Sequence, residues 1–166
     1  MEPTKGIHGM GGIGKTTIAR VCYERIHDKF EAHCFISNIR EKFETSSLPY
    51  LQSELLSRMF SIENSDIGDV HEGIAMINQA VFRKKILLVL DDVNCSDQIM
   101  GLIPNKDSFR NGSRIIITTR NAVSYDRLDE WENEIFLDVA CFFMGKRKEI
   151  VEEILHNCGF PCQNKG

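Results

Sequence analysis

A glycine-rich stretch near the start of the chain, residues 9–17, constrains the fold more than any other part of the sequence. It reads G-M-G-G-I-G-K-T-T and fits the pattern G-x-x-x-x-G-K-[ST] at every fixed position. Glycines allow the backbone to curl so that successive N–H groups point toward phosphate oxygens. The N-terminus of the helix that follows adds unpaired N–H groups and the positive end of its dipole. The stretch therefore predicts a phosphate-binding loop.

The expected phosphate-binding residues are the glycines of this loop and the residues around the last of them: Gly9, Gly11, Gly12, Ile13, Gly14, Lys15, Thr16 and Thr17. In this pattern the lysine, Lys15, reaches the β- and γ-phosphates, and the hydroxyl of Thr16 binds Mg²⁺. Thr17 is placed to offer a second hydroxyl to the α-phosphate.

Composition narrows the class of protein. The chain has 166 residues, of which 42% are hydrophobic and 27% charged, which is enough for one ordinary globular domain. The net charge of −4 gives no basic surface for nucleic acid, and no apolar run approaches the roughly 20 residues of a membrane helix. The six cysteines form no paired framework and no signal peptide is evident, so we expect reduced thiols in the cytoplasm.

Strand and helix patterns alternate along the first 120 residues. Apolar patterns predict strands at 5–8, 32–39, 86–90 and 113–120, and helices after the loop, from Pro49, through 74–81 and at 97–103. This alternation is typical of a doubly wound α/β fold with a parallel sheet. From Ser124 onward no strand is evident, and residues 134–143 and 148–157 read as two helices.

Two acidic residues and one arginine follow buried strands. Asp91 and Asp92 end the apolar run I-L-L-V-L, and Arg120 ends the next strand. In doubly wound folds ligands bind at the carboxyl ends of the strands. One aspartate there can hold Mg²⁺ and the other can polarise an attacking water, while Arg120 can reach a γ-phosphate. The alternatives are that the aspartates cap the next turn and that Arg120 is a solvated strand end.

Cysteine and histidine offer weaker patterns. His156, Cys158 and Cys162 have the residue types of a zinc site, but no second pair completes tetrahedral ligation. Cys22, Cys34 and Cys141 lie on apolar patterns and read as packed thiols.

Taken in order, the three motifs resemble those of the NB-ARC module of plant disease-resistance proteins. The matching stretches are G-I-H-G-M-G-G-I-G-K-T-T (6–17), K-I-L-L-V-L-D-D-V (85–93) and G-S-R-I-I-I-T-T-R (112–120). The resemblance implies a P-loop switch that binds ADP at rest and ATP when activated, and at most a slow ATPase of the STAND class. It assigns Lys15 and Thr16 to phosphate and Mg²⁺, Asp91 to the metal, Asp92 to hydrolysis, and Arg120 to sensing the nucleotide.

Further stretches resemble the subclass that carries a TIR domain. These are residues 32–41 (A-H-C-F-I-S-N-I-R-E), Asn94, and residues 135–143 (I-F-L-D-V-A-C-F-F), the last in a winged-helix part. The resemblance implies a nucleotide-binding unit at 1–121 and a partial helical, winged-helix-like remnant at 122–166. It implies TIR and leucine-rich-repeat domains as partners within the full receptor, located in the cytoplasm or also in the nucleus.

The chain departs from the family between Arg120 and Ser124. Family members carry there the last strand of the sheet and a four-helix unit, which implies that this chain is a fragment or an aberrant splice product with an internal deletion. Without that strand, we expect residues 5–8 to form an exposed edge. The short link from Asn121 gives the tail little reach to cover it, so the chain is expected to be poorly folded alone.

Two other functions stay open at this level. One is a small P-loop ATPase or kinase, which would need a lid with arginines and an acceptor pocket. The other is an interaction fragment or decoy that binds no nucleotide. A titration with fluorescent ADP separates this last case from the others.

Overall fold

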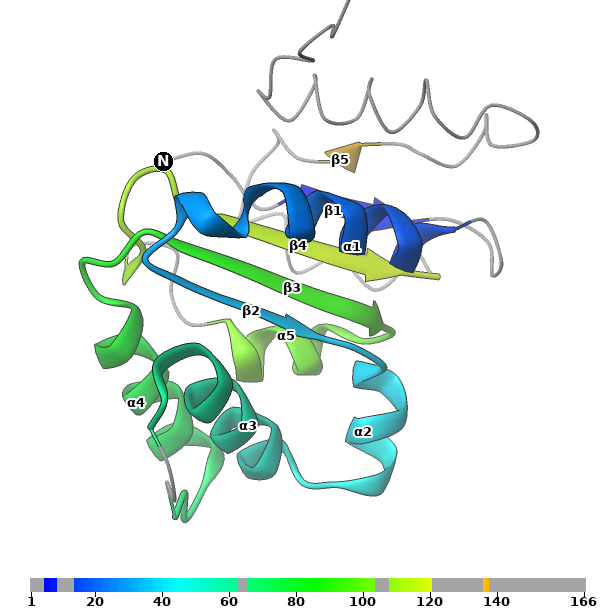
Figure 1. Cartoon of the computed structure of the whole chain (residues 1–166). Helices are drawn as coiled ribbons and strands as arrows, with labels where there is room; N and C mark the ends of the chain where they lie inside the picture. The colour runs from blue at the N-terminus through cyan, green and yellow to red at the C-terminus, as the bar shows by residue number, and fades with distance from the viewer. Residues whose placement is uncertain (1–4, 9–13, 63–65, 104–107, 121–135, 138–166) are drawn as a thin grey trace, which may run out of the picture.

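Parallel strands form the centre of the molecule, with helices on both sides (Figure 1). The computed structural model describes residues 5–8, 14–62, 66–103, 108–120 and 136–137. Its elements, in chain order, are β1 (Lys5–His8), α1 (Lys15–Ile26), the short 3-10 helix η1 (His27–Lys29), β2 (Ala32–Ile36), α2 (Ile39–Thr45), α3 (Leu48–Phe60), α4 (Val70–Val81), β3 (Ile86–Val93), α5 (Ser96–Leu102), β4 (Arg114–Thr119) and β5 (Phe136–Leu137).

The strand order in the described part of the sheet is β2-β3-β4-β1-β5, and every pair is parallel. Each of the connections β1–β2, β2–β3 and β3–β4 contains at least one helix, as parallel pairing requires. The α/β fold predicted from the sequence is therefore confirmed.

The strand β3 lies between β2 and β4 and is buried on both faces, which explains its unbroken apolar run. Leu87 and Val89 pack against α1 on one face of the sheet. Ile86, Leu88 and Leu90 point to the other face, where they join the core formed with α2, α3, α4 and α5. The phosphate-loop helix α1 thus covers one face of the sheet, and the other described α-helices, α2 to α5, cover the opposite face (Figure 1).

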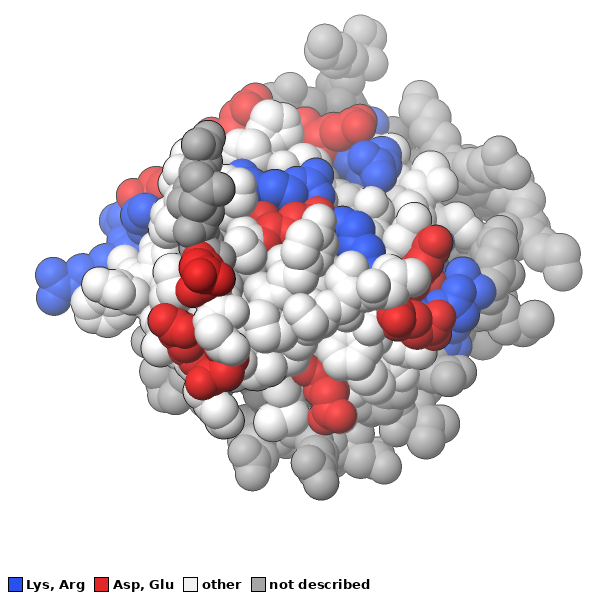
Figure 2. Space-filling view, turned by 90° about the horizontal axis from the view of Figure 1, so that it is seen from below, with Lys and Arg blue, Asp and Glu red and all other residues white. Residues whose placement is uncertain are grey.

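The helices on this second side begin where the sequence places start signals. Ser47 caps α3 by accepting from the Tyr50 N–H, with Pro49 in the first turn as expected. Asp69 caps α4 by accepting from two backbone N–H groups, those of His71 and Glu72. Figure 2 views the molecule from the side of these helices and shows acidic and basic side chains interspersed among uncharged ones. No helix among the described residues is long and apolar enough to cross a bilayer.

The strand predicted at 32–39 is too long. The strand β2 ends at Ile36, and Asn38 adopts a left-handed conformation (φ 56°) from which α2 starts at Ile39. Ile39 is fully buried in the same core cluster as Ile36, so the apolar pattern continues across the turn although the strand does not. The apolar pattern also continues past the end of α1. This helix ends at Ile26, and Phe30, which is buried as well, follows η1.

The prediction that β1 is an exposed edge is wrong. Phe136 and Leu137 form β5, which pairs in parallel with Gly6 and Ile7 of β1. Both residues lie where the sequence predicted a helix and no strand. Backbone N–H and C=O groups along an unpaired edge of β1 would be costly to bury without partners. The short extended segment β5 supplies partners to this edge. The sheet therefore includes two residues from beyond position 121, while the helix predicted at 148–157 lies outside the described residues.

Candidate functional site

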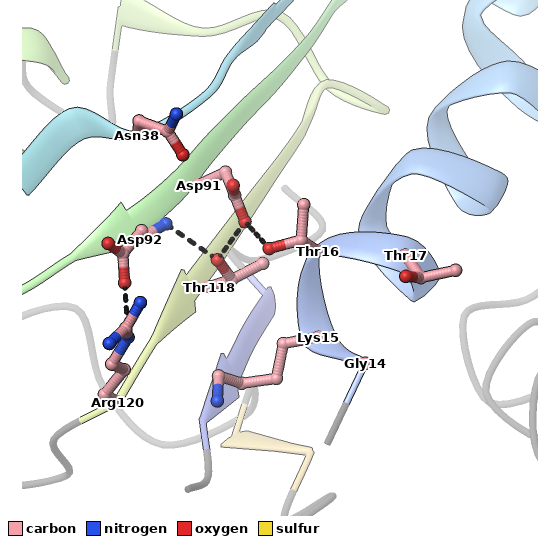
Figure 3. A pocket seen from close by; sticks show the side chains of 9 residues that line it. All are labelled: Gly14, Lys15, Thr16, Thr17, Asn38, Asp91, Asp92, Thr118 and Arg120. Atoms are coloured by element: carbon pink, nitrogen blue, oxygen red, sulfur yellow. Dashed lines mark hydrogen bonds and ion pairs between the residues drawn. The ribbon is translucent and has the colours of Figure 1, made fainter. Parts of the chain in front are cut away.

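Seven of the residues singled out in the sequence line one cavity of about 320 Å³. The cavity lies at the edge of the sheet where β3 and β4 end and α1 begins (Figure 3). Its described lining is Gly14, Lys15, Thr16, Thr17, Asn38, Asp91, Asp92, Thr118 and Arg120. The other four, Gly9, Gly11, Gly12 and Ile13, lie outside the described residues.

The start of α1 forms one wall. Gly14 precedes the helix in a left-handed conformation (φ 87°), which glycine adopts without the steric cost that a side chain brings. Gly14, at the N-cap position, has no side chain with which to cap the helix. Its first-turn N–H groups have no partners within the helix, and they carry the positive end of the helix dipole. This end of α1 therefore suits an anion.

A buried carboxylate joins this helix to the sheet. Asp91, on β3, is 1% exposed. Its Oδ1 accepts from the Thr16 hydroxyl at 2.8 Å and from the Thr118 hydroxyl at 2.6 Å (Figure 3). Three segments distant in sequence therefore meet at one oxygen atom.

The second aspartate has a different environment. Asp92 has φ 59° at an irregularity in the pairing of β3 with β4, and its N–H donates to Thr118 Oγ1 at 2.9 Å. Its carboxylate binds two guanidinium groups: Arg120 Nε lies 2.9 Å from Oδ1, and Arg40 Nε lies 3.3 Å from Oδ2. A left-handed residue other than glycine costs of order 1–3 kcal/mol, and here it places a carboxylate between two arginines.

Lys15 reaches into the cavity from the first residue of α1, and only 8% of the residue is exposed (Figure 3). Burial lowers the pKa of its ammonium group, and the nearby positive charge of Arg120 lowers it further. Asp92 and Asp91 act in the opposite direction. The net shift of the pKa is downward, so the charged form of Lys15 is less favoured here than in water, and an anion bound beside it would favour that form.

The donor atoms at this edge fit Mg²⁺. Thr16 donates its hydroxyl hydrogen to Asp91 Oδ1, which leaves the lone pairs of the hydroxyl oxygen and the second carboxylate oxygen, Oδ2, available to a cation. A hydroxyl and a carboxylate oxygen are also the hard ligands that this cation prefers.

Sequence reasoning missed three residues here. Asn38 lines the cavity and Thr118 binds both aspartates, whereas Arg40 pairs with Asp92 from α2. Thr118 carried a signal, since it lies two residues before Arg120 at the end of a buried strand. Asn38 and Arg40 carried no signal of a site: Asn38 lies within the predicted strand, and the stretch 32–41 that contains both carries only a resemblance to the TIR-carrying subclass.

The zinc trio His156, Cys158 and Cys162 lies outside the described residues, as does Cys141. Within the described residues, no three histidine, cysteine, aspartate or glutamate side chains gather as metal ligands would. Cys22 and Cys34 are buried as expected. Burial raises the pKa of Cys34 to about 11, which keeps this thiol protonated and unreactive at neutral pH.

Comparison with known proteins places this site in a family. The NB-ARC domain family matches residues 4–142, and the Roq1-like winged-helix domain of disease resistance proteins matches residues 129–164. The disease resistance protein RUN1 of Vitis rotundifolia is 44% identical over 117 residues, which is 70% of this chain and 9% of that protein. The TMV resistance protein N of Nicotiana glutinosa is 37% identical over 123 residues, covering 70% of this chain and 10% of that protein.

A third relative aligns over almost the whole chain. The disease resistance protein RPV1 of Vitis rotundifolia is 28% identical over 252 residues, covering 95% of this chain and 18% of that protein. The chain thus spans less than a fifth of the length of these relatives. Because the family model covers residues 4–142, most of the sequence, the chain belongs to the NB-ARC family of nucleotide-binding modules.

Proposed function

We propose that this chain binds ADP and ATP, with Mg²⁺, in the cavity at the start of α1, and that it acts as the ADP/ATP switch of a plant immune receptor. One observation carries the proposal: Lys15, Thr16, Asp91 and Arg120, from three separate motifs, line one cavity. Family membership supports the nucleotide, and the names of the relatives support a role in disease resistance.

Each residue has a distinct role in this proposal. The backbone at Gly14 and the start of α1, with Lys15, would bind the phosphates, because N–H donors and an ammonium group neutralise their charge. Thr17 would add a hydroxyl to the α-phosphate. Thr16 and Asp91 would hold Mg²⁺, which when bound neutralises charge that builds up on the phosphates. Arg120 would contact the γ-phosphate, which ATP has and ADP lacks, and would so distinguish the two nucleotides.

Hydrolysis would be slow. Asp92 would be the residue that orients water, but its two carboxylate oxygens are engaged by Arg120 and Arg40 in the structure without nucleotide. With Arg120 turned to the γ-phosphate, Arg40 would still hold one oxygen of this carboxylate, so the carboxylate would be less free to orient a water molecule. A binding switch needs only this slow turnover.

The wider receptor is part of the proposal. TIR and leucine-rich-repeat domains would be the partners of this module, as the motif resemblance implies. The alignment with RPV1 spans 252 residues although this chain has 166, so RPV1 carries residues inside the aligned span that this chain lacks. That difference supports an internal deletion. We propose, on the motif resemblance, a nucleotide unit at 1–121 followed by a partial helical, winged-helix-like remnant at 122–166.

A titration with fluorescently labelled ADP tests the proposal. We expect saturable binding that strengthens with Mg²⁺ and is competed by unlabelled ADP and ATP. Thr16→Ala should remove most of the Mg²⁺ effect, because it deletes one metal ligand. Thr45→Ala, which removes an exposed hydroxyl bonded to carbonyls of its own helix, is the control and should bind as the parent does. Absence of saturable binding in the parent chain would overturn the proposal.

A further inference from the structure

The carboxylate of Asp92 has two arginine partners that differ in their position relative to the cavity. Arg120 lines the cavity, and its side chain is 52% exposed. Arg40, the second residue of α2, approaches the other carboxylate oxygen and is not part of the cavity lining. The carboxylate between them is only 15% exposed.

This arrangement decides which arginine can leave. If Arg120 turns to a terminal phosphate, it must give up its 2.9 Å bond to Asp92 Oδ1. With Arg40 in place, Asp92 keeps one guanidinium partner on Oδ2 during that movement. Without Arg40, the same movement would leave a largely buried carboxylate with neither arginine, which is costly.

We propose that Arg40 is a positioning residue that keeps Asp92 paired when Arg120 moves to the terminal phosphate, and that it thereby sets the preference of the site for ATP over ADP. The inference rests on the proposed function, because it adds a residue to the same nucleotide site. ADP lacks the γ-phosphate that would draw Arg120 away, so Arg40 matters for ATP and not for ADP.

The test compares affinities for ADP and for the non-hydrolysable β,γ-imido analogue of ATP, measured by calorimetry on the full chain with Mg²⁺. We expect Arg40→Ala to weaken binding of the ATP analogue by roughly threefold to tenfold, the range for one charge-assisted hydrogen bond at a partly exposed site. Affinity for ADP should change by less than about twofold. Arg58→Ala removes an exposed arginine paired with Glu54 on α3 and should change neither affinity.

A double variant separates this role from a general effect on the fold. Asp92→Asn removes the charge that needs a partner, so Arg40→Ala/Asp92→Asn should have the same ratio of ATP-analogue to ADP affinity as Asp92→Asn alone. Arg40→Gln is a second variant for the case in which Arg40→Ala does not fold. Its unfolding curve, recorded beside that of the parent, shows whether it is folded.

Failure of the inference and failure of the proposed function look different. If the parent chain binds both nucleotides and Arg40→Ala weakens both equally or neither, the inference is overturned while the nucleotide site stands. The inference also fails if Arg40→Ala/Asp92→Asn and Asp92→Asn alone differ in their ratio of ATP-analogue to ADP affinity. If the parent chain binds neither nucleotide, the proposed function falls, and the role of Arg40 with it.

Discussion

The Thr16 hydroxyl donates a 2.8 Å hydrogen bond to Oδ1 of Asp91, although 75 residues separate the two in sequence. This bond fixes the first turn of the phosphate-loop helix α1 to the carboxyl-terminal part of β3. Thr118 donates to the same oxygen from β4 at 2.6 Å. The relative placement of the lysine, the hydroxyl and the acidic group therefore depends on a few buried polar contacts as well as on the sheet.

Thr118→Val should destabilise the chain by about 1–3 kcal/mol, the cost of leaving buried polar groups without partners. Thr118 is 1% exposed, donates to Asp91 and accepts from the Asp92 N–H, so valine removes both bonds while keeping the shape. Urea unfolding measures the change, and Thr118→Ser, which retains the hydroxyl, should recover most of it. A valine variant as stable as the parent would show that these contacts add nothing to stability.

Gly73→Ala should destabilise the packing of α4 on α3. In an exposed helix this change would stabilise by about 1 kcal/mol. Here the new methyl group would collide with the side-chain amide of Gln52, which is fully buried and donates to the carbonyls of Val70 and Gly101 at 3.0 and 2.8 Å. Overpacking costs about 1–3 kcal/mol and each lost hydrogen bond about 1 kcal/mol more, so the cost outweighs the helix gain.

Denaturant unfolding measures this effect as well. The double variant Gly73→Ala/Gln52→Ala should be destabilised by less than the sum of the single changes, because removing the amide removes the collision. A gain in stability for Gly73→Ala alone would refute the packing argument.

Replacing both residues of β5 by proline, Phe136→Pro/Leu137→Pro, should expose the backbone of β1. Proline has no N–H to donate, so it would weaken the pairing in which β5 lies beside Gly6 and Ile7. We expect faster hydrogen exchange at those amides of residues 5–8 that face β5. The amides of β2, which lies at the other end of the sheet order, serve as the internal reference. Unchanged exchange in β1 would mean that β5 does not protect it.

Nucleotide binding should take up protons at alkaline pH. The pKa of Lys15 in the folded chain lies below the ordinary 10.5, so between the two values the unfolded chain binds more protons. The buried lysine therefore destabilises the fold at lower pH, and this penalty is relieved as the pH rises through that interval. A phosphate beside Lys15 favours the charged form and raises its pKa again.

Calorimetry in two buffers of different ionisation enthalpy measures the proton uptake. At about pH 9.5 the phosphates are fully ionised, since their last pKa is about 6, and the uptake belongs to the protein. It should be larger there than at about pH 7.5, where Lys15 is closer to fully charged before binding. Proton release on binding, or uptake that does not grow with pH, would contradict the assignment of Lys15.

The convergence of Lys15, Asp91 and Arg120 could be predicted from sequence for a physical reason. Parallel strands end at one edge of the sheet, so residues that follow their apolar runs must lie near one another. The phosphate-loop helix begins at that same edge. Local patterns place these residues at that edge, although they leave open that Asp91 caps the next turn and that Arg120 is a solvated strand end.

Arg40 and β5 could not be predicted in the same way. The position of Arg40 depends on a left-handed turn at Asn38, yet the apolar pattern continues unbroken to Ile39 because both sides of the turn reach the same core. The two residues of β5 are extended because β1 offers them backbone partners, and nothing in their own spacing marks them as a strand. Pairing over long distances in sequence outweighs local preference in such short segments.

The most direct test of the central claim is the affinity of ADP for Lys15→Ala compared with the parent chain, measured by calorimetry with Mg²⁺. Lys29→Ala, in η1 beyond the far end of α1, is the control. A charge-assisted contact of about 1.5–3 kcal/mol predicts that Lys15→Ala loses at least about tenfold in affinity, with the control unchanged. Equal affinities of the parent and Lys15→Ala would contradict a phosphate-binding role for this lysine and the site built around it.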